Sequence, residues 1–202
     1  MAVSTYDKIA DKYASQFFDD LSDSPYFDKF LFYLDKGSRV LDIGCGNGNF
    51  SKYISDRGFY CEGIDLSSGM LRIARKRVPG IKFLLKDMWK LDYQPESFDG
   101  LLVAYSLIHI HSDEVVSTLQ GFNKLLEPGG IVLLITYKGE PDKVVNEPFM
   151  PSEKMFFNFF TKQRLLEFLE KAGFQIVFQE EKGVSDADSM SDTIIYTLAR
   201  KV

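Results

Sequence analysis

Three glycines and one aspartate stand where this sequence could bind a nucleoside-containing cofactor. Gly44, Gly46 and Gly48 follow a short apolar run, and Asp65 closes the next such run, at the distance of about 20 residues that is typical of nucleotide sites. Glycines let backbone N–H groups approach a ligand at the start of a helix. A carboxylate in the position of Asp65 can accept hydrogen bonds from both hydroxyls of a ribose.

The spacing of the glycines bears on which cofactor is bound. A dinucleotide fingerprint, G-x-G-x-x-G, requires its third glycine at position 49, where this sequence has Asn49, and the third glycine is Gly48 instead. The spacing therefore disfavours NAD. A nicotinamide-dependent oxidoreductase nevertheless remains an alternative, because it would use the same loop and Asp65.

A sheet whose strands alternate with helices is needed to bring these residues together. Short apolar runs predict five parallel strands with right-handed crossovers, and the amphipathic stretches between them predict helices. The strands are expected near 38–43, 59–64, 81–85, 98–104 and 130–137, and the helices at about 48–57, 68–78 and 112–126.

The last part of the chain departs from this alternation. One helix is expected at about 161–172, ending at Gly173, and two strands follow near 174–181 and 193–200. The acidic connection at 183–192 is too short for a parallel crossover, so these two strands should pair antiparallel.

Two segments stand outside the predicted sheet. Residues 1–35 should form two helices, and residues 138–160, with three prolines, should be mostly irregular. The chain is thus expected to be a single domain, 1–202. Its parts would be a helical cap at 1–35, a cofactor-binding core at 36–137, a substrate-side insertion at 138–160 and a C-terminal helix and hairpin at 161–202.

Composition excludes several classes of protein. The chain has 202 residues, 45% apolar and 26% charged, which is typical of a globular domain. Its net charge of −5 disfavours a general nucleic-acid binder or an anionic-membrane binder. Two cysteines without a C-x-x-C pair predict neither a disulfide scaffold nor a cysteine zinc site. With no signal-peptide pattern and no apolar run of about 20 residues, a cytoplasmic protein is expected.

Several segments, taken in order, resemble one family: the Rossmann-like, class I S-adenosylmethionine-dependent methyltransferases, in their small-molecule branch. The segments that carry the resemblance are 40–48, 65–71, 86–88, 98–109 and 126–130. The resemblance implies an α/β fold with a seven-stranded, mostly parallel sheet that ends in an antiparallel C-terminal hairpin. It also implies helices on both faces of the sheet and an N-terminal helical lid.

The resemblance further implies S-adenosyl-L-methionine as cofactor and a role for individual residues. It places Gly44, Cys45 and Gly46 at the methionine end, Asp65 at the ribose, Leu66 and Met88 around the adenine, Asp87 at the adenine amino group and the Ala104 backbone under the sulfonium. Asp42 would either order the glycine loop or reach the cofactor's ammonium through water. Asp87 could instead serve only in a turn after its strand.

Residues at the amino terminus could close over a bound cofactor. Tyr6, Ile9, Ala10 and Tyr13 fall on one face of a helix, as they would in the opening helix of the family. The same spacing also fits plain amphipathic packing. Aromatic residues gather here and in a later segment, because fourteen of the chain's 29 rings lie within 6–33 and 149–160. Rings at such density predict an apolar lid suited to an aromatic or lipophilic acceptor.

His109 is the one candidate for acid–base work on the acceptor. It follows the fourth predicted strand, and its pKa range suits removal of a proton from a hydroxyl or an amine. The competing interpretation is a histidine that only packs. His109 and His111 lack a third ligand at a diagnostic spacing, so no metal site is predicted.

These observations predict a methyltransferase that acts on a small molecule. The Asn/Asp-Pro-Pro-Tyr/Phe signature of many nucleic-acid methylating enzymes does not occur, and no nucleic-acid or membrane partner is expected. A non-catalytic S-adenosylmethionine-binding protein would keep the same glycine loop and Asp65, so it remains an alternative. The acceptor, the atom methylated and the oligomeric state do not follow from the sequence.

Overall fold

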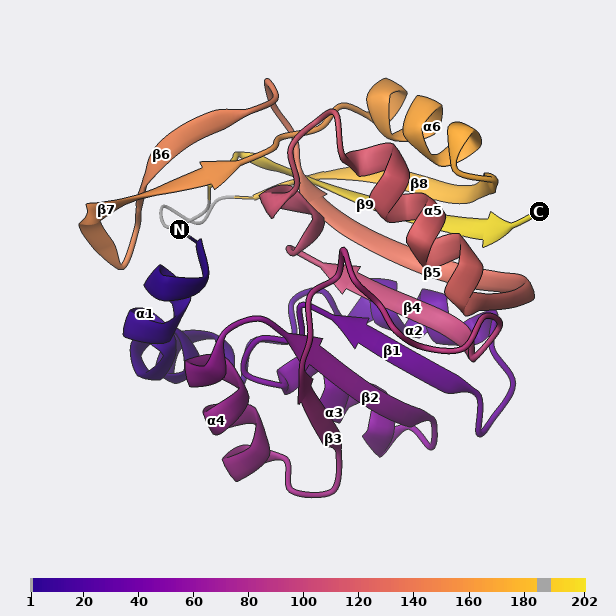
Figure 1. Cartoon of the computed structure of the whole chain (residues 1–202), viewed down its shortest axis with the longest axis horizontal. Coiled ribbons are helices and arrows are strands. Elements are labelled where there is room, and N and C mark those ends of the chain that lie inside the picture. Colours follow the sequence, from indigo (N-terminus) through magenta and orange to yellow (C-terminus); the bar gives the residue numbers. More distant parts are fainter. Residues whose placement is uncertain (1, 185–189) are drawn as a thin grey trace.

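A seven-stranded sheet forms the centre of the molecule in a computed structural model that describes residues 2–184 and 190–202 (Figure 1). The strand order is β3-β2-β1-β4-β5-β9-β8. The strands are β1 (Arg39–Ile43), β2 (Tyr60–Asp65), β3 (Lys82–Leu85), β4 (Phe98–Ala104), β5 (Leu126–Tyr137), β8 (Phe174–Gly183) and β9 (Thr193–Lys201). The first five run parallel, and β9 pairs antiparallel with β5 and β8. The predicted fold class is confirmed.

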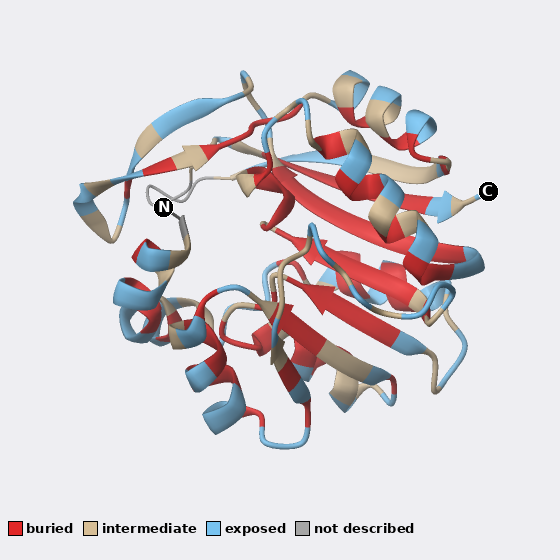
Figure 2. Ribbon diagram, viewed as in Figure 1, coloured by how far each residue is buried: buried red, intermediate tan, exposed pale blue. Residues whose placement is uncertain are grey.

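The alternation of side chains along the central strands builds a core on each face of the sheet. Val40 and Leu102 point to the face covered by α2 (Ser24–Phe32) and α3 (Asn49–Asp56). Leu41 and Leu101 point to the face covered by α5 (Val115–Leu125) and α6 (Lys162–Lys171). Adjacent residues of a strand face opposite sides, so a continuous apolar run fits a strand buried on both faces. Figure 2 shows this burial along the central strands.

The N-terminal helix α1 (Ala2–Phe17) is tied to the start of α4 (Ser68–Arg77). Asp7 Oδ1 accepts hydrogen bonds from the Gly69 backbone N–H and the Ser67 hydroxyl, both at 2.7 Å. These bonds lower the pKa of Asp7, because a carboxylate at a helix N-terminus is stabilised by the N–H groups there. Small apolar residues, Ala10 and Ala14, pack between the two helices. The expectation of two helices within 1–35 is confirmed by α1 and α2.

The prediction for residues 138–160 is wrong, because this segment holds a β-hairpin. Strands β6 (Lys143–Glu147) and β7 (Met150–Phe157) pair antiparallel, as a two-stranded sheet of their own. Pro148 falls in the turn between the strands. Pro151 falls where the register shifts, so neither proline removes a hydrogen bond that the ladder needs. Prolines at such positions do not exclude a strand.

The hairpin and α1 lie beyond the carboxyl ends of the parallel strands (Figure 1). This edge includes the point between β1 and β4 where the strand order reverses, the usual ligand crevice of such sheets. A short 3-10 turn, η1 (Leu107–His109), follows β4 at the same edge, and α5 starts three residues after its predicted boundary.

The expected loop between β8 and β9 falls partly outside the described residues. Among the described helices, none combines the length and apolar character needed to cross a membrane.

Gly63 of β2 provides a test of how tightly the sheet edge is packed. A Cβ atom on Gly63 would lie 2.6 Å from Phe83 Cδ1 and 2.9 Å from Cys45 Sγ. Gly63→Ala should therefore lower the free energy of unfolding by about 1–3 kcal/mol, measured by denaturant titration. Gly80→Ala is the matched control, since nothing lies within 4 Å of a Cβ there. Equal stability of the two variants would contradict this packing.

Candidate active site

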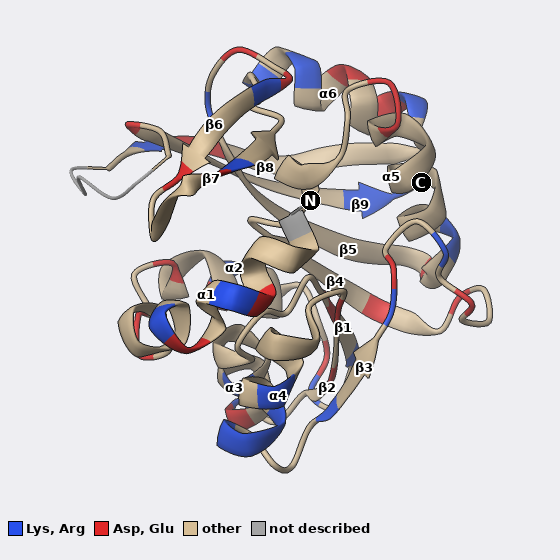
Figure 3. Cartoon of the chain, turned by 60° about the vertical axis from the view of Figure 1, so that its left-hand side comes forward, with Lys and Arg blue, Asp and Glu red and all other residues tan. Residues whose placement is uncertain are grey.

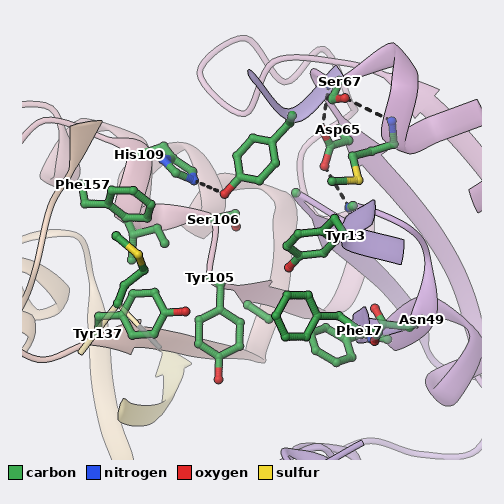
Figure 4. Close-up of a pocket in the computed structure, with 18 of the residues that line it drawn as sticks. Tyr13, Phe17, Asn49, Asp65, Ser67, Tyr105, Ser106, His109, Tyr137 and Phe157 are labelled. Carbon is green, nitrogen blue, oxygen red and sulfur yellow. Dashed lines mark hydrogen bonds between the residues drawn. The ribbon is translucent and has the colours of Figure 1, made fainter. Parts of the chain in front are cut away.

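A cavity of about 290 Å³ opens at the carboxyl edge of the sheet, beneath α1 and the β6–β7 hairpin (Figure 4). Most of the residues predicted for the site line it: Tyr6, Tyr13, Gly44, Gly46, Asp65, Leu66, Met88, Ala104 and His109. The fold thus brings residues of the N-terminal helix, the glycine loop and the segment after β4 to one cavity.

The glycine loop joins the end of β1 to α3 and exposes backbone to the cavity. Gly44 has a φ of +77°, and its N–H donates to the Ile64 carbonyl at 2.8 Å. A side chain on Gly44 would collide with Ser106, whose Oγ would lie 2.9 Å from the new Cβ. Ser106 in turn donates to the Ile43 carbonyl at 2.6 Å and fastens the ends of β1 and β4 together. Glycine is therefore required here by both conformation and space.

Asp65 is partly buried at the end of β2, where its carboxylate binds both the glycine loop and the residues that start α4. Its Oδ2 accepts from the Gly46 N–H at 2.9 Å, and its Oδ1 accepts from the Ser67 N–H at 2.7 Å. Burial raises the pKa of Asp65, although these backbone bonds oppose the shift. The cap of α4 is Ser67, whose Oγ accepts from the Met70 N–H at 3.1 Å. Asp65 is therefore not the helix cap, and its carboxylate faces the cavity.

Three of the predicted residues do not line the cavity. Asp42 lies beneath the glycine loop, where Ser51 Oγ donates to it at 2.6 Å, and burial raises its pKa to about 7. The Cys45 side chain packs in the core, against α4 and β3. Asp87 accepts from the Trp89 N–H at 3.0 Å, the turn interaction considered as its alternative role. Contact between these three residues and a cofactor stays a prediction.

His109 and Tyr6 form a hydrogen-bonded pair across the cavity. The Tyr6 hydroxyl lies 3.0 Å from His109 Nε2, and His109 Nδ1 lies 3.2 Å from the Phe156 carbonyl oxygen. A carbonyl can only accept, so Nδ1 carries the proton and Nε2 accepts from Tyr6. Burial lowers the pKa of His109 to about 4, which keeps the ring neutral at pH 7. The pair connects α1 with η1 and β7.

Helix α1 and the hairpin also contact each other directly above the cavity. Lys8 Nζ pairs with Glu153 Oε1 at 2.7 Å, and Lys12 Nζ donates to the Phe149 carbonyl at 3.2 Å. The Phe149 ring packs edge-on against Tyr13 and Phe17, with centroids 6.0 and 5.7 Å apart. The exposed ion pair contributes little, and the half-buried rings supply most of the cohesion of this contact.

Three carboxylates in the lining, Asp20, Asp23 and Glu147, were missed by the sequence analysis. Asp23 accepts from the Tyr105 hydroxyl at 2.9 Å and from the Tyr196 hydroxyl at 2.6 Å. Glu147, at the end of β6, accepts from the Met150 N–H at 2.6 Å. Asp23 precedes the Ser-Pro start of α2 and so looks in the sequence like an ordinary helix cap. Its tyrosine partners lie 82 and 173 residues away, and no local signal could have found them.

Comparison with known proteins agrees with this geometry. Residues 40–130 match the model of a methyltransferase domain family. A maize phosphoethanolamine N-methyltransferase is 30% identical over 74% of this chain and 30% of its own length. A demethylmenaquinone methyltransferase from Renibacterium salmoninarum is 30% identical over 50% of this chain and 42% of its own length. This chain thus spans well under half of either relative.

The fold likeness extends to the whole chain in a solved structure. The 1,6-didemethyltoxoflavin-N1-methyltransferase of Burkholderia thailandensis was solved with 1,6-didemethyltoxoflavin and S-adenosylhomocysteine bound. It superposes with a TM-score of 0.78 at 20% identity, covering 100% of this chain and 87% of its own. Residues 40–130 thus match a methyltransferase domain, and the whole chain has the Rossmann-like fold of the class I S-adenosylmethionine-dependent methyltransferases.

The role of Asp65 can be tested by binding. Asp65→Asn keeps the shape of the side chain but removes its charge and half of its acceptor capacity. It should weaken binding of S-adenosylmethionine roughly 10- to 100-fold in calorimetry, since hydrogen bonds to a charged group are worth about 1.5–3 kcal/mol. Asp35→Asn, an exposed change at the opposite end of β1, should bind as the unmodified protein does. Unchanged affinity of Asp65→Asn would contradict a ribose contact.

The neutral state of His109 predicts a pH dependence of stability. In the unfolded chain this histidine has a pKa near 6.5, and in the folded protein about 4. Between these values the unfolded state binds more protons, so His109 lowers the free energy of unfolding as the pH falls from about 6.5, by up to about 3 kcal/mol. Asp42 and Asp65, with raised pKa values, act in the opposite direction over the acidic range.

Comparison with a variant isolates the contribution of His109. Denaturant unfolding of the protein and of His109→Asn at several pH values between 7.5 and 4.5 should give curves that diverge, with the acid-dependent loss present only where His109 is retained. Parallel curves would show that the histidine ionises in the folded protein.

Proposed function

We propose that this protein transfers the methyl group of S-adenosylmethionine to a small molecule with an aromatic or lipophilic body. One observation carries the proposal. A single cavity joins the glycine loop and Asp65 to a second region walled by aromatic side chains. The first part has the groups that a nucleoside-containing cofactor needs, and the second can hold an apolar acceptor next to it.

The residues of the first part fit the cofactor by their chemistry. Gly44 keeps the loop backbone free of a side chain, which would collide with Ser106, and the partly buried Asp65 carboxylate is held at the end of β2 by two N–H groups. Leu66 and Met88, from the ends of β2 and β3, provide the apolar surfaces for the adenine. S-adenosylmethionine supplies a methyl group already activated on a sulfonium, so the protein's task is to position two reactants and exclude water.

Tyr6 and His109 are proposed to hold α1 closed during transfer. The Tyr6 hydroxyl donates to the unprotonated Nε2 of a histidine that the Phe156 carbonyl fixes in its tautomer. With its pKa near 4, His109 is suited to accept this hydrogen bond rather than to take a proton fully from an acceptor at pH 7. We therefore favour a positioning role for His109 over the role of base.

The relatives' names support a small-molecule acceptor. The maize, Renibacterium and Burkholderia proteins are named for phosphoethanolamine, demethylmenaquinone and a didemethyltoxoflavin, which are all small molecules. They differ in charge and size, so the names do not select one acceptor for this chain.

Two measurements separate the proposal from its alternatives. Calorimetric titration with S-adenosylmethionine and, separately, with NAD should give binding only with the first. A panel of aromatic and lipophilic acceptors should then release S-adenosylhomocysteine. Binding of NAD alone would point to an oxidoreductase, and cofactor binding without turnover of any acceptor would favour a binding protein.

The hydrogen bond between Tyr6 and His109 can be tested by removing the Tyr6 hydroxyl. Tyr6→Phe keeps the ring and removes the hydroxyl, so turnover should fall about 3- to 10-fold, the worth of one net hydrogen bond, while cofactor affinity changes less. Tyr60→Phe, on an exposed tyrosine of β2, is the matched control. His109→Ala should slow turnover to a similar extent if it acts through Tyr6, and a much larger loss would make it a base. Normal turnover of Tyr6→Phe would remove the pair from the mechanism.

A further inference from the structure

The sheet order divides the cavity into two halves. Gly44, Asp65 and Met88 follow β1, β2 and β3 and form the half proposed for the cofactor. Tyr105 follows β4, Tyr137 ends β5, and both lie in the other half, on the side of β9. The acceptor must therefore occupy the half over β4, β5 and β9.

Aromatic side chains form the walls of this acceptor half (Figure 4). The rings of Tyr105 and Tyr137 lie 5.2 Å apart between centroids, and His109 lies 5.1 Å from Phe157. Aromatic ring faces carry negative electrostatic potential, so they attract a cation as well as an apolar body.

Two carboxylates that line the cavity are nearly excluded from solvent. Asp23 is 5% exposed and Glu147 is 4% exposed. Each oxygen of Asp23 accepts a tyrosine hydroxyl, which fixes the carboxylate in place. Burial raises the pKa of both groups, as expected for buried acids without a strong counter-ion.

The negative charge extends across the cavity. Burial, and after it the charges of Asp65, Asp20, Asp23 and Glu147, raise the pKa of Tyr13 to about 12. The negative charges of these four acids therefore all act on the Tyr13 hydroxyl of α1. Three of the four, all except Asp65, lie outside the proposed ribose site.

Positive side chains are scarce in the same lining. Among the described residues that line the cavity, Lys86 is the one lysine or arginine; it follows β3 in the cofactor half and pairs with Asp92. Lys12 and Lys182 act on Glu147 and Asp23 from outside the lining, where Lys12 is bonded to the Phe149 carbonyl. Figure 3 shows other Lys and Arg residues on the outer helices α4 and α6.

We propose that the acceptor is an amine that binds as a cation, its ammonium group near Asp23 and Glu147 and its apolar body against Tyr105, Tyr137 and Phe157, and that it carries no phosphate or carboxylate. This inference rests on the proposed methyl transfer and narrows its substrate class. An anionic group in the acceptor half would meet two buried like charges with no cation in the lining to offset them.

The transfer balances with one proton passed to the protein. Asp23 is held as a charge partner by two phenols, so Glu147 takes one proton from the bound ammonium and frees the nitrogen lone pair. That pair forms the bond to the methyl carbon as the carbon–sulfur bond breaks, and its electrons stay on the sulfur. The methylated product is already an ammonium cation, so it leaves as it is formed, and the proton on Glu147 passes to solvent once the site opens.

A pair of isosteres tests cation recognition without knowledge of the natural acceptor. The probes are 3-(trimethylammonio)phenol and 3-tert-butylphenol, which share shape and differ by one charge. Titrated into the protein saturated with S-adenosylhomocysteine, the cation should bind at least ten-fold more tightly. Equal or tighter binding of the neutral probe would overturn the inference.

Variants of the two acids locate the preference. Asp23→Asn and Glu147→Gln should each reduce the advantage of the cation at least five-fold, whereas Glu127→Gln, exposed at the opposite end of the sheet, should leave it unchanged. Asp23→Asn disturbs the bonds from two tyrosines and could unfold. Glu147→Gln keeps a carbonyl oxygen for the Met150 N–H, and its thermal unfolding provides the check. A full preference in a folded Glu147→Gln would overturn the role of Glu147.

Turnover distinguishes this inference from the proposed function. Release of S-adenosylhomocysteine should be faster with phenethylamine than with phenylalanine, which adds a carboxylate, and faster with ethanolamine than with phosphoethanolamine. Preference for the acidic member of either pair would overturn the amine-cation inference and leave methyl transfer standing. Failure to bind S-adenosylmethionine would instead overturn the proposed function itself.

Discussion

The partly buried carboxylate of Asp65 is the constraint on which the site depends. An anion withdrawn from water must be held by hydrogen bonds, and here the donors are the backbone N–H groups of Gly46 and Ser67. One bond orders the glycine loop and the other orders the start of α4. Ser67 then donates to Asp7 of α1 at 2.7 Å, so a chain of short bonds leads from the loop to the lid helix.

A second connection reaches α1 from the other side of the cavity. Tyr6 bonds to His109, which is held by the carbonyl of Phe156 in β7. Two consecutive residues, Tyr6 and Asp7, thus attach the same turn of α1 to η1 and to α4. Any movement of the lid has to break hydrogen bonds on both sides together, which couples the order of the cofactor half to that of the acceptor half.

The sequence allowed the residues of the half proposed for the cofactor to be grouped together because they are local. Gly44, Gly46 and Asp65 lie within about 20 residues of each other on consecutive strands, and their spacing follows from the strand–helix–strand unit. The acceptor half combines α1, the loop before α2, the end of β4, the hairpin and β9. Asp23 with Tyr196 joins residues 173 positions apart, and the prolines before β6, in the turn and in β7 hide the strand pattern of the hairpin. Contacts of that range leave no periodicity or motif in the chain.

The two halves of the cavity also differ in how far a similar fold allows their function to be inferred. The half proposed for the cofactor is shaped by backbone conformation, and a protein only 20% identical shares the fold that carries it. The acceptor half is set by individual side chains on segments that vary in length and position, where one carboxylate or lysine reverses the local charge. In this chain those side chains are aromatic and acidic, with Asp23 and Glu147 buried beside tyrosines. The charge of the cavity lining is therefore a better guide to the acceptor than the substrate for which any relative is named.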